Sequence, residues 1–327
     1  MITSKGKRNS GVVAIGAALL MALTACGGSA TGGSEAEPTS TGPVEVTILY
    51  SRAAEQVGLW VAQEEGLFEK NGVKATLTEA PDATQVAVGI SGGSAQLGYE
   101  TGPDFLSAVD AGVDLVVASG LSVDTAENAR VALIAGKDSG ISSPADVAGK
   151  RIAVPGVNTS SQLSTIRQLE KAGVDVSGIT WVALPFQQAP DAIKSGRIDA
   201  AVSVYPFIGL LKSQGHKPII AQYAAPGEKQ LVVFLSADGK WAGDHPEAVK
   251  GIRKALDEAN AFVAANPDKT RVIMEKYTGL KPEVINAIPF PNLSTDVTKD
   301  QLGFFMDIMK DQKLIKKDLD LGSLIVK

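Results

Sequence analysis

The chain has 327 residues, of which 44% are hydrophobic and 20% charged, a balance that excludes a disordered, collagen-like or coiled-coil protein. The length is enough for two domains of modest size. The net charge of −5 argues against a general nucleic-acid-binding protein, which needs a basic face. One cysteine and two histidines exclude a disulfide framework and disfavour enzymes that rely on these side chains, so we expect no metal and no cofactor.

The first 25 residues are typical of a signal peptide. Lys5, Lys7 and Arg8 precede the apolar stretch Gly11–Ala25, which is shorter than the roughly 20 residues that a membrane span requires. The stretch ends in Leu23-Thr24-Ala25-Cys26, which resembles a bacterial lipobox. That resemblance implies cleavage before Cys26 and attachment of a diacylglyceryl lipid to its sulfur. The alternative is a buried core helix with an incidental thiol.

The segment after Cys26 predicts a flexible tether. Residues 27–43 include 13 Gly, Ser, Thr or Pro residues among 17 and carry no bulky apolar side chain, so they cannot pack. Removal of residues 1–25 takes away three positive charges and no acid, which changes the net charge from −5 to about −8. We therefore expect a folded body held by its lipid on the extracytoplasmic face of the cell membrane.

From Val44 onwards, strands and helices alternate. The intervening helices carry apolar residues at helical spacing, as in Val57, Trp60 and Val61. Such alternation predicts an α/β domain with a largely parallel sheet. The expected strands of this first series are Val44–Tyr50, Val73–Leu77, Ala95–Tyr99 and Leu115–Ser119.

The pattern restarts after the polar stretch Val123–Arg130, and the last third of the chain is mostly helical. Asp244-His245-Pro246-Glu247 predicts a capping box before a long helix, and Asn266-Pro267 predicts the start of the next one. We expect His216 in a surface turn and His245 in the capping sequence, with no chemistry at either. The strands of the second series are expected at Val131–Ala135, Arg151–Val154, Thr180–Leu184, Ile198–Val204, Lys217–Gln222 and Gln230–Ser236.

Four stretches of the body stand out in this order and spacing: Tyr50–Arg52 with Gly58–Phe68, Ala95–Tyr99, Pro144–Val154 and Gly196–Ala201. Together they resemble the solute-binding proteins of ABC importers in the sulfonate/nitrate/taurine and thiamine-precursor group. The resemblance covers residues 44–327 and implies an α/β, two-lobed type II periplasmic-binding-protein fold with a ligand cleft between the lobes. We expect residues 44–128 plus 238–327 in lobe one and residues 129–237 in lobe two.

The candidate ligand-binding residues follow the ends of predicted strands. Ligands of open parallel sheets bind beyond the carboxyl ends of the strands, and the resemblance implies ligand contacts in the same loops. These loops supply Ser51, Arg52, Gln56, Thr101, Gly102, Asn158, Thr159, Ser160 and Tyr205. Hydroxyl groups and free N–H groups near Ser160, at the start of a helix, favour a bound anion, although one of these side chains is also expected to cap that helix. Tyr205 either contacts the ligand or packs beneath the hinge.

The expected ligand is a small organic anion, either a sulfonate or an aliphatic or aromatic carboxylate. The planar guanidinium of Arg52 suits such a group, and the alternative is a solvated surface arginine. Arg130 either supplies a second positive charge or forms a salt bridge at the hinge.

The leading interpretation is a monomeric binding protein that captures a solute without catalysis and delivers it to an ABC permease and its ATPase. One alternative is a pyrimidine-precursor or thiamine-related binding protein or enzyme, since the fold resembles yeast synthases that consume their own histidine and pyridoxal phosphate. Those synthases carry a cysteine-rich motif, whereas Cys26 is the one cysteine here. The other alternative is a surface sensor, which the lack of a spanning segment beyond the tether disfavours.

Overall fold

The structure is a computed structural model, and it describes residues 42–80, 83–221 and 228–326. The predicted signal peptide, Cys26 and the tether as far as residue 41 lie outside these residues. Within the described ranges, no helix combines the length and the apolar character that crossing a membrane would need.

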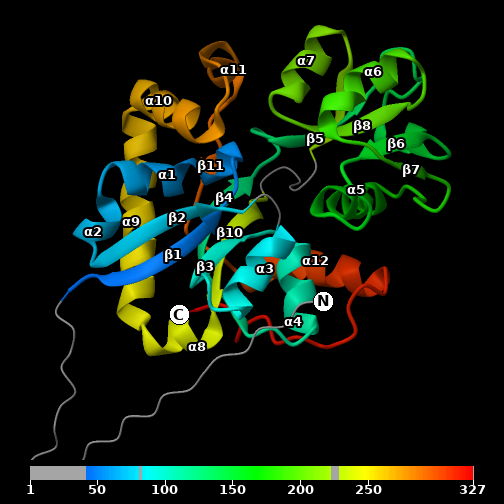
Figure 1. The fold of residues 1–327 in the computed structure, drawn as a ribbon. Coiled ribbons are helices and arrows are strands. Elements are labelled where there is room, and N and C mark those ends of the chain that lie inside the picture. The colour runs from blue at the N-terminus through cyan, green and yellow to red at the C-terminus, as the bar shows by residue number, and fades with distance from the viewer. Residues whose placement is uncertain (1–41, 81–82, 222–227, 327) are drawn as a thin grey trace, which may run out of the picture. The chain divides into compact units, whose positions relative to one another are not determined.

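A first sheet of six strands forms the centre of lobe one (Figure 1). Strand β1 pairs in parallel with β2 from Val44 opposite Val73 to Tyr50 opposite Glu79, and with β3 on its other side. Strand β10 runs antiparallel between β3 and β4. Strands β1 to β4 therefore all end at the same edge. The order is β11 (Asn292–Leu293), β4 (Leu115–Asp124), β10 (Gln230–Asp238), β3 (Leu97–Glu100), β1 (Val44–Tyr50) and β2 (Val73–Glu79).

The position of β10 corrects the predicted lobe boundary at residues 237 and 238. The strand was expected in lobe two, but it pairs with β3 and β4 of lobe one. Its residues Gln230–Ala237 are all buried, so its composition suits a central strand of either sheet. The chain thus returns to lobe one between Ala221, where β9 ends, and Gln230.

A second sheet of five strands forms the centre of lobe two. Strands β6, β7 and β8 are parallel, and β5 is antiparallel to both β8 and β9. The predicted strands Val131–Ala135 and Arg151–Val154 are confirmed residue for residue. The order is β7 (Thr180–Ala183), β6 (Arg151–Val154), β8 (Ala200–Val204), β5 (Val131–Ala135) and β9 (Lys217–Ala221).

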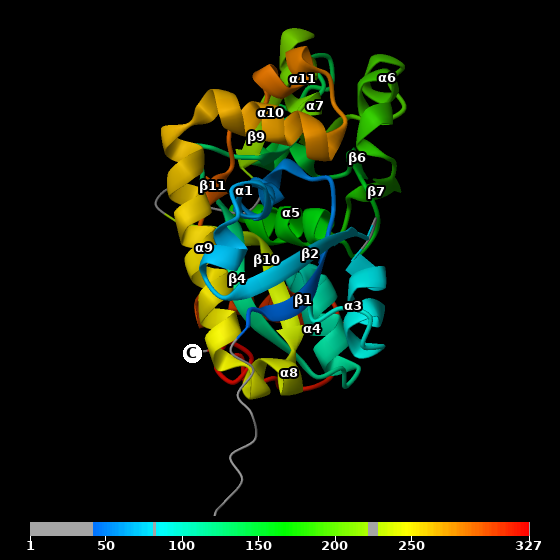
Figure 2. The same cartoon turned by 60° about the vertical axis from the view of Figure 1, so that its left-hand side comes forward.

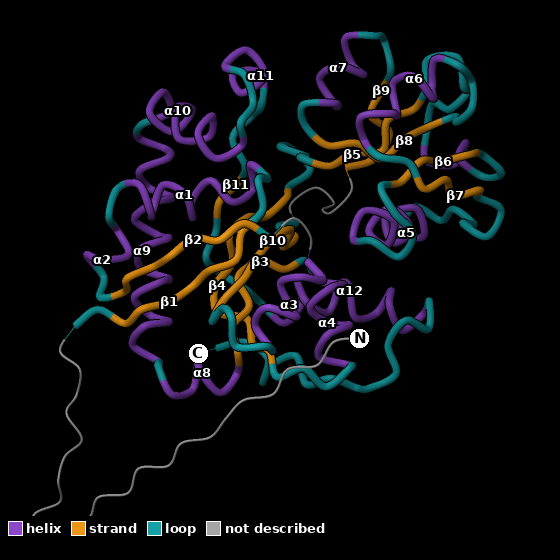
Figure 3. The backbone as a smooth tube through the Cα atoms, viewed as in Figure 1, coloured by secondary structure: helices purple, strands orange, loops and turns teal. Residues whose placement is uncertain are grey.

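Helices cover both faces of each sheet because each face carries apolar side chains. In lobe one, α1 and α9 lie over one face and α3, α4 and α12 over the other (Figures 1 and 2). In lobe two, α6 and α7 pack on one face and α5 on the other, as the tube in Figure 3 shows. Trp60 of α1 is fully buried and stacks on Tyr277 of α10.

The helices of lobe one are α1 (Val57–Glu64), α2 (Leu67–Lys70), α3 (Ala83–Ser91), α4 (Gly102–Asp110), α8 (Gly239–Asp244), α9 (Pro246–Ala265), α10 (Pro267–Thr278), α11 (Pro282–Ala287) and α12 (Lys299–Asp311). Those of lobe two are α5 (Ser160–Lys171), α6 (Ala189–Lys194) and α7 (Phe207–Ser213). Short 3-10 helices add η1 (Ala54–Gln56), η2 (Pro144–Val147) and η3 (Phe186–Gln188).

The predicted capping box at Asp244–Glu247 is wrong. Helix α9 begins after His245 without a side-chain cap, whereas Asn266-Pro267 does precede α10 as predicted. Asp244 is the last residue of α8, so its carboxylate faces one turn back and forms an ion pair with Lys240 instead.

Candidate ligand site at the carboxyl ends of the strands

The sheet order brings the predicted loops of each lobe to one edge. In lobe one, Ser51 follows β1, Thr101 follows β3, and β2 ends at Glu79. In lobe two, the segment after β6 and Tyr205 after β8 share the corresponding edge of the second sheet. These are the positions at which parallel sheets bind ligands.

Ser51 and Gln56 form a closed pair at the end of β1. The Gln56 side chain is fully buried, its amide nitrogen donates to Ser51 Oγ (2.6 Å), and its oxygen accepts from the Ser51 backbone N–H (3.1 Å). This pair holds the turn that leads into η1. Gln56 thus orders the loop, and Ser51 remains half-buried.

Arg52 is held by an acid of the neighbouring strand. Its Nε and Nη2 groups donate to the two carboxylate oxygens of Glu79, each at 2.8 Å, and its side chain is 57% exposed. The Arg52 guanidinium thus binds Glu79 in the bidentate geometry that we expected it to offer to the acid group of a ligand. A ligand would have to compete with Glu79 for this guanidinium.

Thr101 and Gly102 begin helix α4. Thr101 is the N-cap residue, and its hydroxyl donates to the Asp104 carboxylate. A Cβ atom on Gly102 would lie 2.2 Å from the Phe305 ring of α12. The space beside Gly102 is therefore filled by the protein itself, and this glycine permits close packing of α12.

We expect Gly102→Ala to destabilise the fold by about 1–3 kcal/mol, because the added methyl group overpacks a fully buried contact with Phe305. Urea unfolding measures the change. Gly209→Ala in α7 is the matched control, since a Cβ there meets nothing within 4 Å and its φ is not positive. Equal stability of the two variants would contradict the packing role of Gly102.

The segment between β6 and α5 presents an uncapped helix start. Thr159 is the N-cap residue of α5, but its hydroxyl donates to the Gly156 carbonyl (2.9 Å) rather than accepting from the first helical turn. Asn158 adopts a left-handed conformation with φ 60°, and its N–H donates to Gln162 (2.6 Å). The predicted side-chain cap is therefore not formed at Thr159, and the first turn of α5, beginning at Ser160, keeps its positive end.

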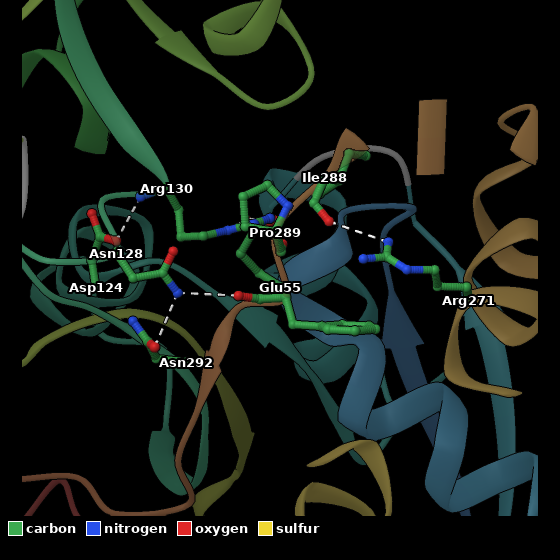
Figure 4. A network of polar contacts seen from close by, with 9 residues as sticks. Glu55, Asp124, Asn128, Arg130, Arg271, Ile288, Pro289 and Asn292 are labelled. Atoms are coloured by element: carbon green, nitrogen blue, oxygen red, sulfur yellow. Dashed lines mark hydrogen bonds and ion pairs between the residues drawn. The ribbon is translucent and has the colours of Figure 1, made fainter. Parts of the chain in front are cut away.

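Arg130 links Tyr205 to lobe one. Its guanidinium carbon lies 5.4 Å from the centre of the Tyr205 ring, and its Nη2 donates to Glu55 of η1 (3.1 Å). It also donates to the Pro289 carbonyl, and its backbone N–H donates to Asp124 (2.8 Å), as Figure 4 shows. The side chain is only 2% exposed. Of its two predicted roles, this is the hinge salt bridge.

Two further side chains, Asn128 and Arg271, support the same region. Asn128 donates to the Phe290 carbonyl and to Asn292, each at 3.1 Å, and Arg271 donates to the Ile288 carbonyl (Figure 4). The first crossing between the lobes is thus tied to the segment that leads into β11. Tyr205 also lines a cavity of about 290 Å³ beside residues 126–129.

Glu100 is a buried acid of this edge that the sequence reasoning missed. It is the last residue of β3, its side chain is fully buried, and neither carboxylate oxygen has a hydrogen-bond partner among the described residues. Burial, and to a smaller extent the charge of Asp104, raises its pKa to about 9. The signal was present, because Glu100 stands directly between the predicted strand and Thr101.

Asp124 is the second missed acid. Strand β4 continues to Asp124 instead of ending at Ser119, so the predicted polar connection starts two residues later than Val123. Its Oδ1 accepts from Arg130 N–H, while Oδ2 has no partner in the described part of the chain. Burial raises its pKa to about 7, although the hydrogen bond and the positive charge of Arg130 oppose the shift.

Larger cavities lie away from the predicted loops. One of about 530 Å³ surrounds His216, Lys137 and Asp199, and one of about 850 Å³ lies beside Arg167 of α5 and Phe304 of α12. The predicted surface turn for His216 is wrong: the side chain is buried, and its Nδ1 accepts from Lys137 N–H (3.0 Å). Neither cavity is lined by a predicted ligand-binding residue, so we place the site by strand topology and loop chemistry.

Comparisons with known proteins agree on one family. The family model described as NMT1/THI5 like matches residues 53–270, well over half of the chain. A protein of Brucella abortus named as a binding protein is 31% identical over 66% of this chain and 66% of its own length, just under two thirds. The taurine-binding periplasmic protein of Escherichia coli is 29% identical over 69% of this chain and 68% of its own.

The crystal structure of the periplasmic aliphatic sulphonate binding protein SsuA from Escherichia coli superposes with a TM-score of 0.72. It is 22% identical and covers 87% of this chain and 92% of that protein. At this identity the likeness concerns the fold, which is that of the periplasmic binding proteins, as predicted.

Proposed function

Because the chain belongs to the NMT1/THI5-like family, we propose that it is the solute-binding protein of an ABC importer. It captures a small solute outside the cytoplasm, without catalysis, and delivers it to a permease and its ATPase. The names of the taurine-binding and sulphonate-binding relatives support this role.

One observation carries the proposal: polar loops follow the carboxyl ends of parallel strands in two sheets that are joined by two chain crossings. Such an arrangement allows two lobes to close on a solute about a hinge. Arg130, with its contacts to Glu55 and Tyr205, lies where the first crossing enters β5.

We propose a small organic anion, a sulfonate or carboxylate, as the ligand. The better supported anchor is the start of α5, where the Thr159 hydroxyl donates to Gly156 and does not cap the helix. The dipole of this helix favours a negative charge at its start. Arg52 is the weaker anchor, because Glu79 already engages its guanidinium.

Two measurements test this function together. Mass spectrometry of small molecules released from the purified protein should identify an organic acid. Small-angle scattering with that acid at saturation should give a smaller radius of gyration than without it, because the lobes close. Chemical conversion of the acid by the protein, or identical scattering curves, would contradict the proposed role.

The proposal includes a lipid anchor at Cys26, in the segment 1–41 that the structure does not describe. Cleavage before Cys26 and addition of a diacylglyceryl group would hold the protein on the extracytoplasmic face of the membrane. Two acyl chains anchor stably, whereas a single chain binds only reversibly. We propose that the body itself is monomeric.

We expect Cys26→Ser to move the protein from the membrane fraction to the soluble fraction of cells, since the lipid can no longer attach. Immunoblots of the two fractions after a high-salt wash measure the distribution. Ser29→Ala, in the adjacent tether, is the control and should stay in the membrane fraction. Membrane retention of Cys26→Ser would disprove the anchor.

A further inference from the structure

The cavity of about 530 Å³ beside His216 lies in lobe two, at the edge of the sheet opposite to the candidate ligand site. Strand β5 ends there at Ala135, and β8 and β9, which run antiparallel to β5, begin there. The turns that line the cavity are the one after β5 and those that lead into β8 and β9. Its volume is within the range of about 300–1,000 Å³ that small-molecule sites occupy.

Close contacts hold the turns around this cavity in place. The Gly136 N–H donates to the Asp199 carbonyl (2.9 Å), and a Cβ atom on Gly136 would lie only 2.9 Å from the side chain of Ile193. The Lys150 ammonium donates to the Ser139 carbonyl (2.9 Å), which fixes the far end of the same turn. The walls of the cavity are therefore formed before any ligand arrives.

His216 gives the cavity a buried hydrogen-bond donor. The residue is only 7% exposed, and its Nδ1 accepts from the Lys137 N–H (3.0 Å), so the neutral ring carries its proton on Nε2. Burial, and to a smaller extent the charge of Lys137, lowers the pKa of His216, so the ring is neutral at pH 7. The Nε2–H group has no hydrogen-bond partner in the described part of the chain. Because buried donors nearly always have a partner, this group calls for an acceptor inside the cavity.

The charges around the cavity favour an acceptor with one negative charge. Lys137 and Lys194 both line it, and neither has an ion-pair partner among the residues that the structure describes. The Asp199 carboxylate is already neutralised, because Arg151 donates to its two oxygens at 3.0 and 2.8 Å. Asp138 is the one remaining acid of the lining. Two lysines against one such acid leave a surplus of one positive charge, which matches a monoanion.

We propose that this cavity is a second ligand site, which binds a small monocarboxylate with an apolar body. The Nε2–H group of His216 donates to the carboxylate, and the ammonium groups of Lys137 and Lys194 supply the opposite charge. Two buried isoleucines of the lining, Ile193 and Ile198, contact the apolar body, which an inorganic anion would leave uncovered. The site is independent of the solute in the cleft, since no residue proposed to bind that solute lines this cavity.

NMR of the protein labelled at its histidine rings observes this site directly, because the chain has only two histidines. His245 is the internal reference, since it lies in lobe one and its ring stacks on Trp241. The spectrum of His245→Gln assigns the two sets of signals. Benzoate should shift the signals of His216 in a saturable way and leave those of His245 in place. Benzamide, its neutral isostere, and inorganic phosphate, which has no apolar body, should each bind about tenfold or more weakly.

The double variant Lys137→Gln/Lys194→Gln keeps the buried ring and should weaken benzoate binding at His216 about tenfold or more. The matched control is Lys240→Gln/Lys250→Gln, which removes two exposed lysines of lobe one and should bind as the wild type does. Unmoved His216 signals, an unchanged affinity of the first variant, or equal binding of benzamide or phosphate would overturn the proposed site. Each of these results would leave the proposed function intact, because the solute in the cleft is identified by mass spectrometry and scattering.

Discussion

Arg130→Ala is expected to lower the free energy of unfolding by about 3–5 kcal/mol, because it leaves Glu55 and its neighbours without a buried partner. The side chain is 2% exposed, whereas that of Glu55 is 20% exposed, so most of the pair is shielded from water. The substitution also removes the hydrogen bond to the Pro289 carbonyl and the contact with the Tyr205 ring. Urea unfolding followed by circular dichroism measures the loss.

Lys74→Ala provides the matched control. Lys74 forms an ion pair with Glu45 at a similar distance, 2.8 Å, but both side chains are more than half exposed. Exposed pairs contribute about 0–1 kcal/mol, so this variant should stay close to the wild type. If Arg130→Ala lowered the free energy of unfolding no more than Lys74→Ala, the salt bridge between Arg130 and Glu55 would not stabilise the fold.

Glu100→Gln is expected to make the protein more resistant to alkaline pH. The folded-state pKa of Glu100 is about 9, against an ordinary value of 4.5, so the folded protein holds a proton that the unfolded chain releases. The stability from this group is complete below pH 4.5 and falls by up to about 1.4 kcal/mol per pH unit until pH 9. Glutamine stays neutral, so the variant escapes this loss.

Unfolding in urea at pH 5, 6, 7 and 8 measures the effect as a gap between the two proteins that widens with pH. The pKa of Asp124 is raised to about 7 from 3.8, so this group also lowers the stability as the pH rises towards 7. Asp124 is present in both proteins, so its contribution cancels in the comparison. Glu247→Gln should follow the wild-type curve, because its side chain is 83% exposed. Parallel curves for the wild type and Glu100→Gln would show that Glu100 is ionised in the folded protein.

These two variants test different properties of the structure. Arg130 ties the first crossing to lobe one through Glu55, so its loss should weaken the hinge. Glu100 is not part of that network, and its replacement leaves every described hydrogen bond in place.

Local sequence patterns determined most of the secondary structure and the loops of the candidate site. Strands such as Val131–Ala135 and Arg151–Val154 follow from short apolar runs with polar ends. Because a parallel sheet aligns the ends of its strands, the same patterns predicted that Ser51, Thr101 and Tyr205 would follow strands at the ligand edge. The predicted family and fold are confirmed for the same reason, since the resemblance rests on these contiguous stretches.

The partners of the charged side chains were decided by the tertiary structure alone. Arg52 and Glu79 are 27 residues apart in the sequence, and Arg130 and Glu55 are 75 residues apart. No local sequence pattern therefore predicts either ion pair. The sheet to which β10 belongs and the burial of His216 depend likewise on strand order. Whether an acid such as Glu100 is solvated or buried depends on what other elements pack around it. Burial and pairing are properties of the assembled sheets, because distant segments supply both the low dielectric and the missing partner.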